Sequence, residues 1–403
     1  MNKKALLVTT VSGFVPQFEM NNVHILQEMG FEVHYAANYS NPSYGDDNRR
    51  LDGTGIVRHQ VDFVRSPFRS ENLTAYKQLK KLMTDHRFQL VHCHTPMGSV
   101  LARLAAHSTK TGPVIYTAHG FHFYAGAPLK NWLFYYPVEK FLSRYTDQQI
   151  CINHEDFKRA SSRFHSRYTD YIPGAGIDLS RVLEADSINK SEKKRQLKLP
   201  QDRKILLSSG ELIRRKNHET VLRALAKLKI SRDDFQYVIC GHGELNDYLH
   251  QLASDLQIAD HVTFLGYRTD ILEVYRAADL FIFPSFQEGL PMALLEAMAS
   301  GLPVLCSDIR GSNDLMEPSS PSDTAPSNMP AAAGIILCRG GIMVKQADDA
   351  DAYCQALLHL LSTPEELLEM GMANRTRAAD FRSELVTEKM RKIYERLAGA
   401  QEC

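Results

Sequence analysis

The sequence predicts an α/β protein made of two doubly wound, Rossmann-like domains. Short apolar runs alternate with longer helical patterns, which is the rhythm of a parallel sheet covered by helices on both faces. The length of 403 residues leaves room for two or three cores, and the rhythm lapses once, in a polar stretch over 185–202 that we interpret as the linker region. We therefore place one domain at 1–185 and the other at 186–381, with a helix at about 382–403 as a candidate to complete the first.

Five apolar runs of strand length are predicted in each domain. In the first domain they cover 4–9, 31–36, 89–93, 113–117 and 149–152, and Gly30 ends the helix between the first two runs. In the second domain they cover 204–209, 235–240, 262–265, 280–283 and 303–306. Ligands of such sheets bind beyond the carboxyl ends of the strands, so two facing domains predict a site in the cleft between them.

The composition excludes several classes of protein. Hydrophobic residues make up 44% and charged residues 23%, which argues against a disordered or disulfide-stapled chain. The 47 basic and 47 acidic residues give a net charge of zero, so no nucleic-acid partner is predicted, although the first domain is the more basic one. The seven scattered cysteines and the absence of a signal-peptide pattern or a long apolar stretch predict a cytoplasmic protein without a membrane span.

The most informative segment is 283–304, which carries two glutamates. A strand ends at its start, Glu288 and Gly289 follow in a turn, and Pro291 stands where a helix that ends before Gly301 should begin. The amino end of such a helix can hold a diphosphate without a metal, and a carboxylate can accept from two hydroxyls of a sugar or ribose. The alternative is that Glu296 is an exposed helical residue and Glu288 a turn residue. Its apolar sequence neighbours make an unpartnered Glu296 costly, which weakens this alternative.

A second segment follows the first strand of the second domain. Gly210 opens a strand-to-helix turn that carries Arg214, Arg215 and Lys216. Three adjacent cations suit the neutralisation of a departing diphosphate. Alternatively the segment is a basic loop in which Asn217 caps the next helix.

Four histidines stand at strand ends of the first domain. His92 and His94 stand at the end of one strand, and His119 and His122 follow the next. Such side chains can bind a sugar hydroxyl or serve as acid and base groups, whereas a backbone-satisfied histidine is the default for at least two of them. We predict no metal site, because carboxylates and cysteines at ligand spacing are missing from these segments.

The first strand-to-helix turn, over 9–16, argues against the main competing class of enzyme. It contains Gly13 but no G-x-G-x-x-G, the fingerprint of dinucleotide oxidoreductases. No G-x-S-x-G elbow of a hydrolase occurs either.

The glutamate segment resembles a known signature. It begins with Glu288-Gly-Leu-Pro and continues with Glu296-Ala-Met-Ala-Ser-Gly-x-Pro-Val, so that seven residues separate the two glutamates. This pattern is similar to the motif of glycosyltransferase family 4, a family of retaining enzymes with the GT-B fold. Further segments resemble its bacterial capsular and exopolysaccharide branch, in the expected order: Tyr116–Tyr124, Ile172–Asp178, Gly241–Glu244, Gly266–Asp270 and Ser307–Gly311.

The resemblance implies roles for individual residues. Glu288 would contact donor-sugar hydroxyls, Glu296 the ribose, and Lys216, with Arg215 or Arg214, the departing diphosphate. His119 would line the sugar pocket as a third catalytic residue. The amides of Gly289 and Leu290 would bind the diphosphate, and the turn at Gly210 would also contact the donor. Gly13 would let its loop approach the phosphates, and Tyr267 and Arg268 would flank the base. The chain departs from the family pattern at Glu211, where many relatives carry Arg. Either Arg214 or Arg215 supplies the missing cation, or the phosphates are bound differently here.

The expected activity is transfer of an N-acetylhexosamine or hexose from a UDP-sugar to a glycan acceptor, with retention and without a metal or other cofactor. The expected acceptor is linked to a polyprenyl diphosphate at the inner membrane face. Two alternatives stay open, a UDP-sugar 2-epimerase of the same fold and a noncatalytic nucleotide-sugar-binding protein. The aromatic stretch over 129–142 is either a buried core helix or a peripheral membrane contact, and the Ser/Pro-rich stretch over 318–330 is predicted to be a mobile surface insertion without a catalytic role.

Overall fold

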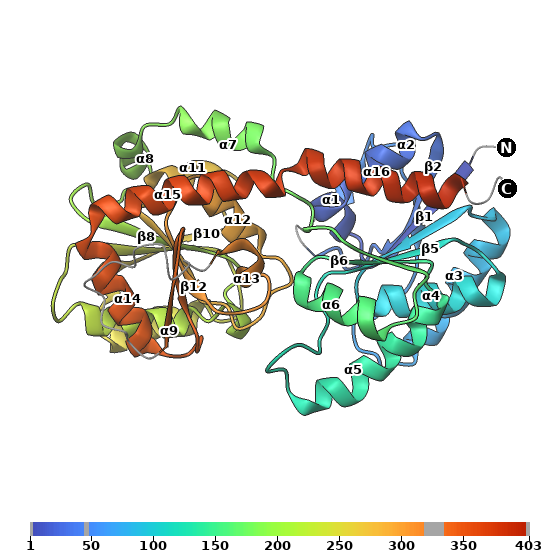
Figure 1. Ribbon diagram of the computed structural model, residues 1–403, viewed down its shortest axis with the longest axis horizontal. Coiled ribbons are helices and arrows are strands. Elements are labelled where there is room, and N and C mark those ends of the chain that lie inside the picture. The colour runs from blue at the N-terminus through green and yellow to red at the C-terminus, as the bar shows by residue number, and fades with distance from the viewer. Residues whose placement is uncertain (1–2, 44–47, 318–333, 400–403) are drawn as a thin grey trace. The chain divides into compact units, whose positions relative to one another are not determined.

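The computed structural model describes residues 3–43, 48–317 and 334–399 (Figure 1). The chain forms two compact units. The first holds the described residues up to Gly176 together with those from Glu384 onward, and the second holds Ile177–Ser383. The Ser/Pro-rich stretch 318–330 lies outside the described residues. Among the described helices, none has the length and apolar character needed to cross a lipid bilayer.

The first unit is built on a seven-stranded sheet in the order β3-β2-β1-β4-β5-β6-β7, with every neighbouring pair parallel. Its strands are β1 (Lys3–Val11), β2 (Phe31–Asn38), β3 (Val57–Gln60), β4 (Leu90–Cys93), β5 (Val114–Ala118), β6 (Gln148–Cys151) and β7 (Tyr168–Tyr171). Its helices are α1 (Phe14–Phe18), α2 (Met20–Glu28), η1 (Asn48–Leu51), α3 (Glu71–His86), α4 (Pro96–Thr109), α5 (Leu129–Leu142), η2 (Ser143–Tyr145), α6 (His154–Arg163) and α16 (Ser383–Gly399).

The five strands predicted for this unit are confirmed, and β3 and β7 were not predicted. Both are edge strands whose residues are largely exposed or only half-buried, so they lack the apolar run that marks a central strand. The helix at the end of the chain, α16, packs on this sheet through Met390, Ile393 and Tyr394. The Tyr394 hydroxyl lies 2.8 Å from Nδ1 of His92 on β4.

The second unit is built on a sheet in the order β10-β9-β8-β11-β12-β14-β13, parallel except for the β13–β14 hairpin. Its strands are β8 (Lys204–Ser209), β9 (Phe235–Cys240), β10 (Val262–Gly266), β11 (Leu280–Phe283), β12 (Val304–Ser307), β13 (Ile335–Cys338) and β14 (Gly341–Val344). Its helices are α7 (Leu179–Asp186), α8 (Lys190–Gln196), η3 (Arg214–Lys216), α9 (His218–Leu228), α10 (Asn246–Asp255), η4 (Ala259–His261), α11 (Ile271–Ala277), α12 (Met292–Ala299), α13 (Ser312–Leu315), α14 (Ala350–Ser362), α15 (Pro364–Ala378) and η5 (Ala379–Phe381).

The polar stretch 185–202, predicted as the linker region, belongs to the second unit and contains α8. Asn189 caps this helix by accepting from the backbone N–H of Glu192. Lys193 is buried and donates to Asp270 at 2.8 Å and to Glu273 at 2.6 Å. A charged sequence is therefore packed by ion pairs here, which an apolar periodicity cannot reveal.

Each sheet has one topological switch point, where ligands of doubly wound folds bind. In the first unit it lies between β1 and β4, and in the second between β8 and β11. Gly13 follows β1, and His94 follows β4. In the second unit Gly210 follows β8, and the loop that carries Glu288 follows β11.

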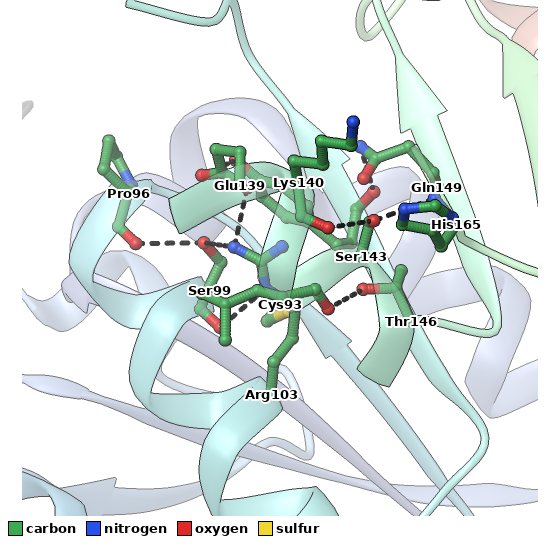
Figure 2. A network of polar contacts seen from close by, with 12 residues as sticks. Cys93, Pro96, Ser99, Arg103, Glu139, Lys140, Ser143, Thr146, Gln149 and His165 are labelled. Carbon is green, nitrogen blue, oxygen red and sulfur yellow. Dashed lines mark hydrogen bonds and ion pairs between the residues drawn. The ribbon is translucent and has the colours of Figure 1, made fainter. Parts of the chain in front are cut away.

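The aromatic helix α5 is attached to the first unit by a buried ion pair. Arg103 on α4 is fully buried and donates to Glu139 on α5 at 2.9 Å, as Figure 2 shows. Arg103 also donates to the backbone carbonyl of Ser99 at 3.1 Å, and its guanidinium lies 4.1 Å from the centre of the Tyr116 ring. Along α5 itself only Glu139 and Leu142 are buried.

Candidate functional site

The two motifs predicted to bind the donor meet in the second unit. Glu288 Oε1 accepts from Lys216 Nζ at 2.8 Å and lies 3.0 Å from Arg215 Nη1. The side chains of Glu288 and Lys216 are only 10% and 14% exposed, so their charges interact in a medium less polar than bulk water. The Lys216 ammonium also lies 5.1 Å from the centre of the Phe283 ring.

Backbone contacts hold these two loops together. Asn217, in a left-handed conformation with φ of 57°, donates from its side chain to the carbonyls of Pro284 at 2.9 Å and Ala347 at 2.6 Å. The Phe286 N–H donates to the carbonyl of Arg215 at 2.9 Å. The meeting of Lys216 and Glu288 is thus fixed by the loops and does not depend on their side chains alone.

Two predicted glycines stand where a side chain would collide. A Cβ at Gly210 would lie 3.2 Å from Cε of Lys216, so glycine leaves room for that side chain. A Cβ at Gly13 would lie 1.9 Å from the carbonyl oxygen of Ser43, and the Gly13 N–H donates to the carbonyl of Pro42 at 2.9 Å. Because Gly13 has no Cβ, the backbone of Pro42 and Ser43 can lie directly against it.

The helix that follows Glu288 starts and ends as predicted. Pro291 is the N-cap of α12, Ser300 is its C-cap, and Gly301 follows with φ of 76°. The backbone N–H groups of Gly289 and Leu290 have no hydrogen-bond partner among the described residues. They are available, next to the helix amino end, to an anionic ligand.

Glu296 is half-buried on α12, not an exposed helical residue. Burial raises its pKa to about 7, which a hydrogen bond from Tyr275 Oη at 3.4 Å opposes. At neutral pH its carboxyl group is therefore shared between a form that accepts hydrogen bonds and a form that can also donate one. Both forms suit a ligand hydroxyl.

Among the described residues, Arg214, Tyr267 and Arg268 form no ion pair with Glu288, unlike Arg215 and Lys216. Arg214 is exposed, and Arg215 is the arginine that contacts Glu288. Tyr267 is 67% exposed, and its N–H donates to His242 Nε2 at 3.3 Å. Arg268 forms a two-point contact with Asp270 at 2.8 and 2.7 Å. The roles of these residues stay predictions.

In the first unit, a second cluster forms around His119. His94 Nδ1 lies 3.1 Å from His119 Nε2, and Glu19 Oε1 lies 3.5 Å from each of these nitrogens. Glu19 sits between α1 and α2 and was not predicted from the sequence. It is 75 positions before His94, outside any strand end or motif, so only the fold brings it there.

Burial controls the charge of this cluster. It raises the pKa of Glu19 to about 8, against the effect of a hydrogen bond from Asn22. It lowers the pKa of His119 to about 4 and that of His94 well below its usual value. At neutral pH both imidazoles are uncharged, and the carboxyl group is largely protonated.

The other two histidines have different surroundings. His92 is fully buried between the hydroxyls of Tyr394 and Thr117, each 2.8 Å away, which fits a structural role. His122 stacks on Tyr135 of α5 with ring centres 4.6 Å apart. The pocket beside the cluster is lined by Glu19 and His119 together with Phe18, Asn21, Asn22, Thr117, Ile150, Ile152, Ile172, Gly174, Ala175, Val386, Thr387 and Met390.

The two parallel-sheet, Rossmann-like units define the fold as GT-B. Among solved structures, the Anabaena protein Alr3699/HepE in complex with UDP-glucose matches with a TM-score of 0.75 and 15% identity, over 97% of this chain and 99% of that one. This likeness confirms the predicted fold.

The sequence comparisons name the family. The family models "Glycosyl transferase 4-like" and "Glycosyl transferases group 1" match residues 3–153 and 189–377. The Bacillus subtilis (strain 168) protein that bears the name glycosyltransferase EpsD is 35% identical over 401 residues, 98% of this chain and 97% of that protein. An Escherichia coli relative, a UDP-Gal:alpha-D-GlcNAc-diphosphoundecaprenol alpha-1,3-galactosyltransferase, is 29% identical over 77% of this chain and 80% of that one. The chain belongs to the family-4-like glycosyltransferases, which confirms the resemblance and makes it an enzyme.

Proposed function

We propose that the chain transfers an N-acetylhexosamine or a hexose from a UDP-sugar to a polyprenyl-diphosphate-linked glycan, with retention, in the synthesis of a surface polysaccharide. The observation that carries the proposal is the contact of Lys216 and Arg215 with Glu288 at the switch point of the second sheet. Two cations and a carboxylate there fit a sugar diphosphate. The names of two relatives support the substrates, since one transfers from UDP-Gal to a diphosphoundecaprenol acceptor and one was solved with UDP-glucose.

The proposed mechanism is front-face attack, in which the acceptor oxygen approaches the sugar C1 from the side on which the diphosphate leaves. The bond between the sugar C1 and the diphosphate oxygen breaks while the acceptor oxygen bonds to C1 on the same face. The acceptor proton passes to the departing diphosphate, so the step needs no separate base. Lys216 and Arg215 stabilise the charge that develops on the diphosphate, which is why we propose transfer without a metal.

Further residues receive roles in this proposal. Glu288 binds hydroxyls of the donor sugar, the Gly289 and Leu290 amides bind the diphosphate, and Glu296 binds the ribose. Gly210 leaves room for Lys216. The same proposal assigns Tyr267 and Arg268 to the base and Arg214 to the diphosphate. It places His119 in the sugar pocket and lets the loop at Gly13 approach the phosphates.

One assay tests the activity. The purified full chain is incubated with UDP-glucose, UDP-galactose and their N-acetylated forms, with and without a crude lipid-linked acceptor, and free UDP and sugar identity are followed. We expect UDP release with one donor only when acceptor is present, and a product with the anomeric configuration of the donor. Interconversion of the donor without acceptor would instead identify an epimerase, and UDP binding without release a noncatalytic protein. An inverted product would contradict the mechanism.

We further propose that α5 rests on the anionic inner face of the cytoplasmic membrane. One face of the helix packs on the core through Trp132 and Tyr136, but several other apolar side chains are exposed. Leu133 and Phe134 are each 64% exposed and Leu129 is 72% exposed, which argues against a helix buried on all sides. Lys130 and Lys140 lie on the same helix and complement anionic lipid. The helix lies at the margin of its unit (Figure 1).

Vesicle co-sedimentation tests this surface. The double variant Leu133→Ser/Phe134→Ser is expected to bind phosphatidylglycerol vesicles at least about tenfold more weakly, because it removes two side chains that would leave water. Ile230→Ser in the second unit is the matched control, since Ile230 is 88% exposed but outside α5. Equal binding to anionic and neutral vesicles, or an equal loss in the control, would count against the proposal.

A further inference from the structure

We propose that Glu19, His94 and His119 form a binding site for one divalent transition-metal ion of the zinc type. The inference goes beyond the proposed transfer, which relies on Lys216 and Arg215 of the other unit. The three donor atoms, His94 Nδ1, His119 Nε2 and Glu19 Oε1, form a nearly equilateral triangle with sides of 3.1, 3.5 and 3.5 Å. In the described part of the first unit, these are the three groups whose ligand atoms all lie within 4.8 Å of one another.

The triangle has the size that a metal requires. Zinc bonds of about 2.0–2.1 Å to nitrogen and oxygen, at tetrahedral angles, separate neighbouring ligand atoms by about 3.3–3.4 Å. The mean of the three observed sides falls in this range. Two histidines and one carboxylate are also a recurring ligand set for zinc and ferrous iron, with further positions left open.

The charges of the cluster favour a cation. The Glu19 side chain is 7% exposed, and among the described residues its only ion-pair partners are His94 and His119. No lysine or arginine of the described residues forms an ion pair with this buried carboxyl group. A bound divalent ion would supply the positive charge that the group lacks.

The site is open on one side. The His119 side chain is 27% exposed, and Glu19 and His119 both line the pocket of the first unit. An open position suits water or a ligand hydroxyl as a fourth ligand, unlike the closed shell of a structural zinc site. Because the ion would occupy Nε2 of His119, we expect metal and a sugar hydroxyl to compete for this nitrogen.

The experiment uses the full chain after removal of metal with a chelator. Zinc is titrated in competition with a chromophoric chelator, and cobalt(II) is then added to a fresh sample to record its visible spectrum. We expect one equivalent of tight binding and the intense visible bands of a four- or five-coordinate cobalt site with nitrogen and oxygen ligands. A thiolate-to-cobalt charge-transfer band would overturn the proposal, because no cysteine belongs to the cluster.

Variants assign the site. Glu19→Gln keeps the shape of the side chain and is expected to weaken zinc binding at least about 100-fold, and His94→Gln likewise. The matched control is Glu32→Gln. Glu32 lies 2.6 Å from Nε2 of His34, whose other nitrogen faces His59 at 2.8 Å, so these donors do not converge on one point.

Several outcomes would overturn the assignment. They are absence of tight binding in the unaltered chain, an equal loss in Glu32→Gln, or full affinity in Glu19→Gln. Circular dichroism of each variant separates loss of the site from loss of the fold. Sugar transfer is measured in parallel without metal, so that failure of the metal site and failure of the proposed activity are recognised separately.

Discussion

Replacing Lys216 by methionine is expected to slow sugar transfer by roughly 10²–10³-fold, the effect of removing one preorganised group that stabilises charge in a transition state. Methionine keeps much of the length of the side chain but cannot neutralise a departing diphosphate. Glu288→Gln is expected to lower the rate to a similar extent, because the amide replaces a carboxylate that would accept from two sugar hydroxyls. The rate of UDP release with acceptor present is the measurement.

The structure indicates how these variants should divide between binding and turnover. Lys216 and Arg215 both contact Glu288, and this carboxylate holds the two cations in place next to the proposed diphosphate position. Lys216→Met should therefore lower kcat more than it raises KM, since its charge matters most when the leaving group is most negative. Lys227→Met is the control in the same unit, because Lys227 pairs with Asp351 at the exposed surface of α9. Near-normal turnover in both Lys216→Met and Glu288→Gln would remove the proposed mechanism.

The sequence could predict that the two motifs of the second unit lie close together, because both stand next to strand ends. In a doubly wound sheet the carboxyl ends of β8 and β11 are neighbours, so motifs after these strands meet. Which arginine would contact Glu288 could not be decided, because Arg214 and Arg215 differ only in how the short helix η3 turns them.

The first-unit cluster was only half predictable. His94 and His119 follow adjacent parallel strands, which favours their proximity. Glu19 follows no strand directly, and its approach depends on the break between α1 and α2. The prediction of no metal site considered only carboxylates in the sequence segments around these histidines, and Glu19, which the fold brings close to them, lies outside those segments.

The edge strands and α5 also show that an apolar sequence pattern predicts only part of the structure. Periodicity detects burial, so β3 and β7, which are largely exposed or half-buried, left no strong pattern. In α5 the pattern is aromatic, yet several of its apolar side chains are exposed, and its buried residue besides Leu142 is the charged Glu139. Trp132 and Tyr136 pack against the core, and the helix is also attached by an ion pair between residues 36 positions apart, which no local pattern contains.

That ion pair leads to the second large expected effect. Arg103→Met is expected to lower the free energy of unfolding of the first unit by about 3–5 kcal/mol, the usual cost of leaving one buried charge without its partner. Glu139 would keep only the hydroxyl of Tyr116, at 3.3 Å, in a position where its side chain is 10% exposed. Urea unfolding followed by the fluorescence of Trp132 measures this directly, because the chain has one tryptophan and it lies on α5.

The double variant Arg103→Met/Glu139→Leu distinguishes charge from packing as the cause. If the unpaired carboxylate is responsible, removing it as well should restore most of the lost stability, since apolar residues of similar volume often replace a buried ion pair without net cost. If the double variant is as unstable as Arg103→Met, the loss comes from the contacts of Arg103 with Tyr116 and Ser99. Lys392→Met on α16 serves as the control, because its pair with Glu388 is exposed and should contribute little. A stable double variant would also leave α5 in place with its apolar face intact, so vesicle binding should persist in it although the buried charges are gone.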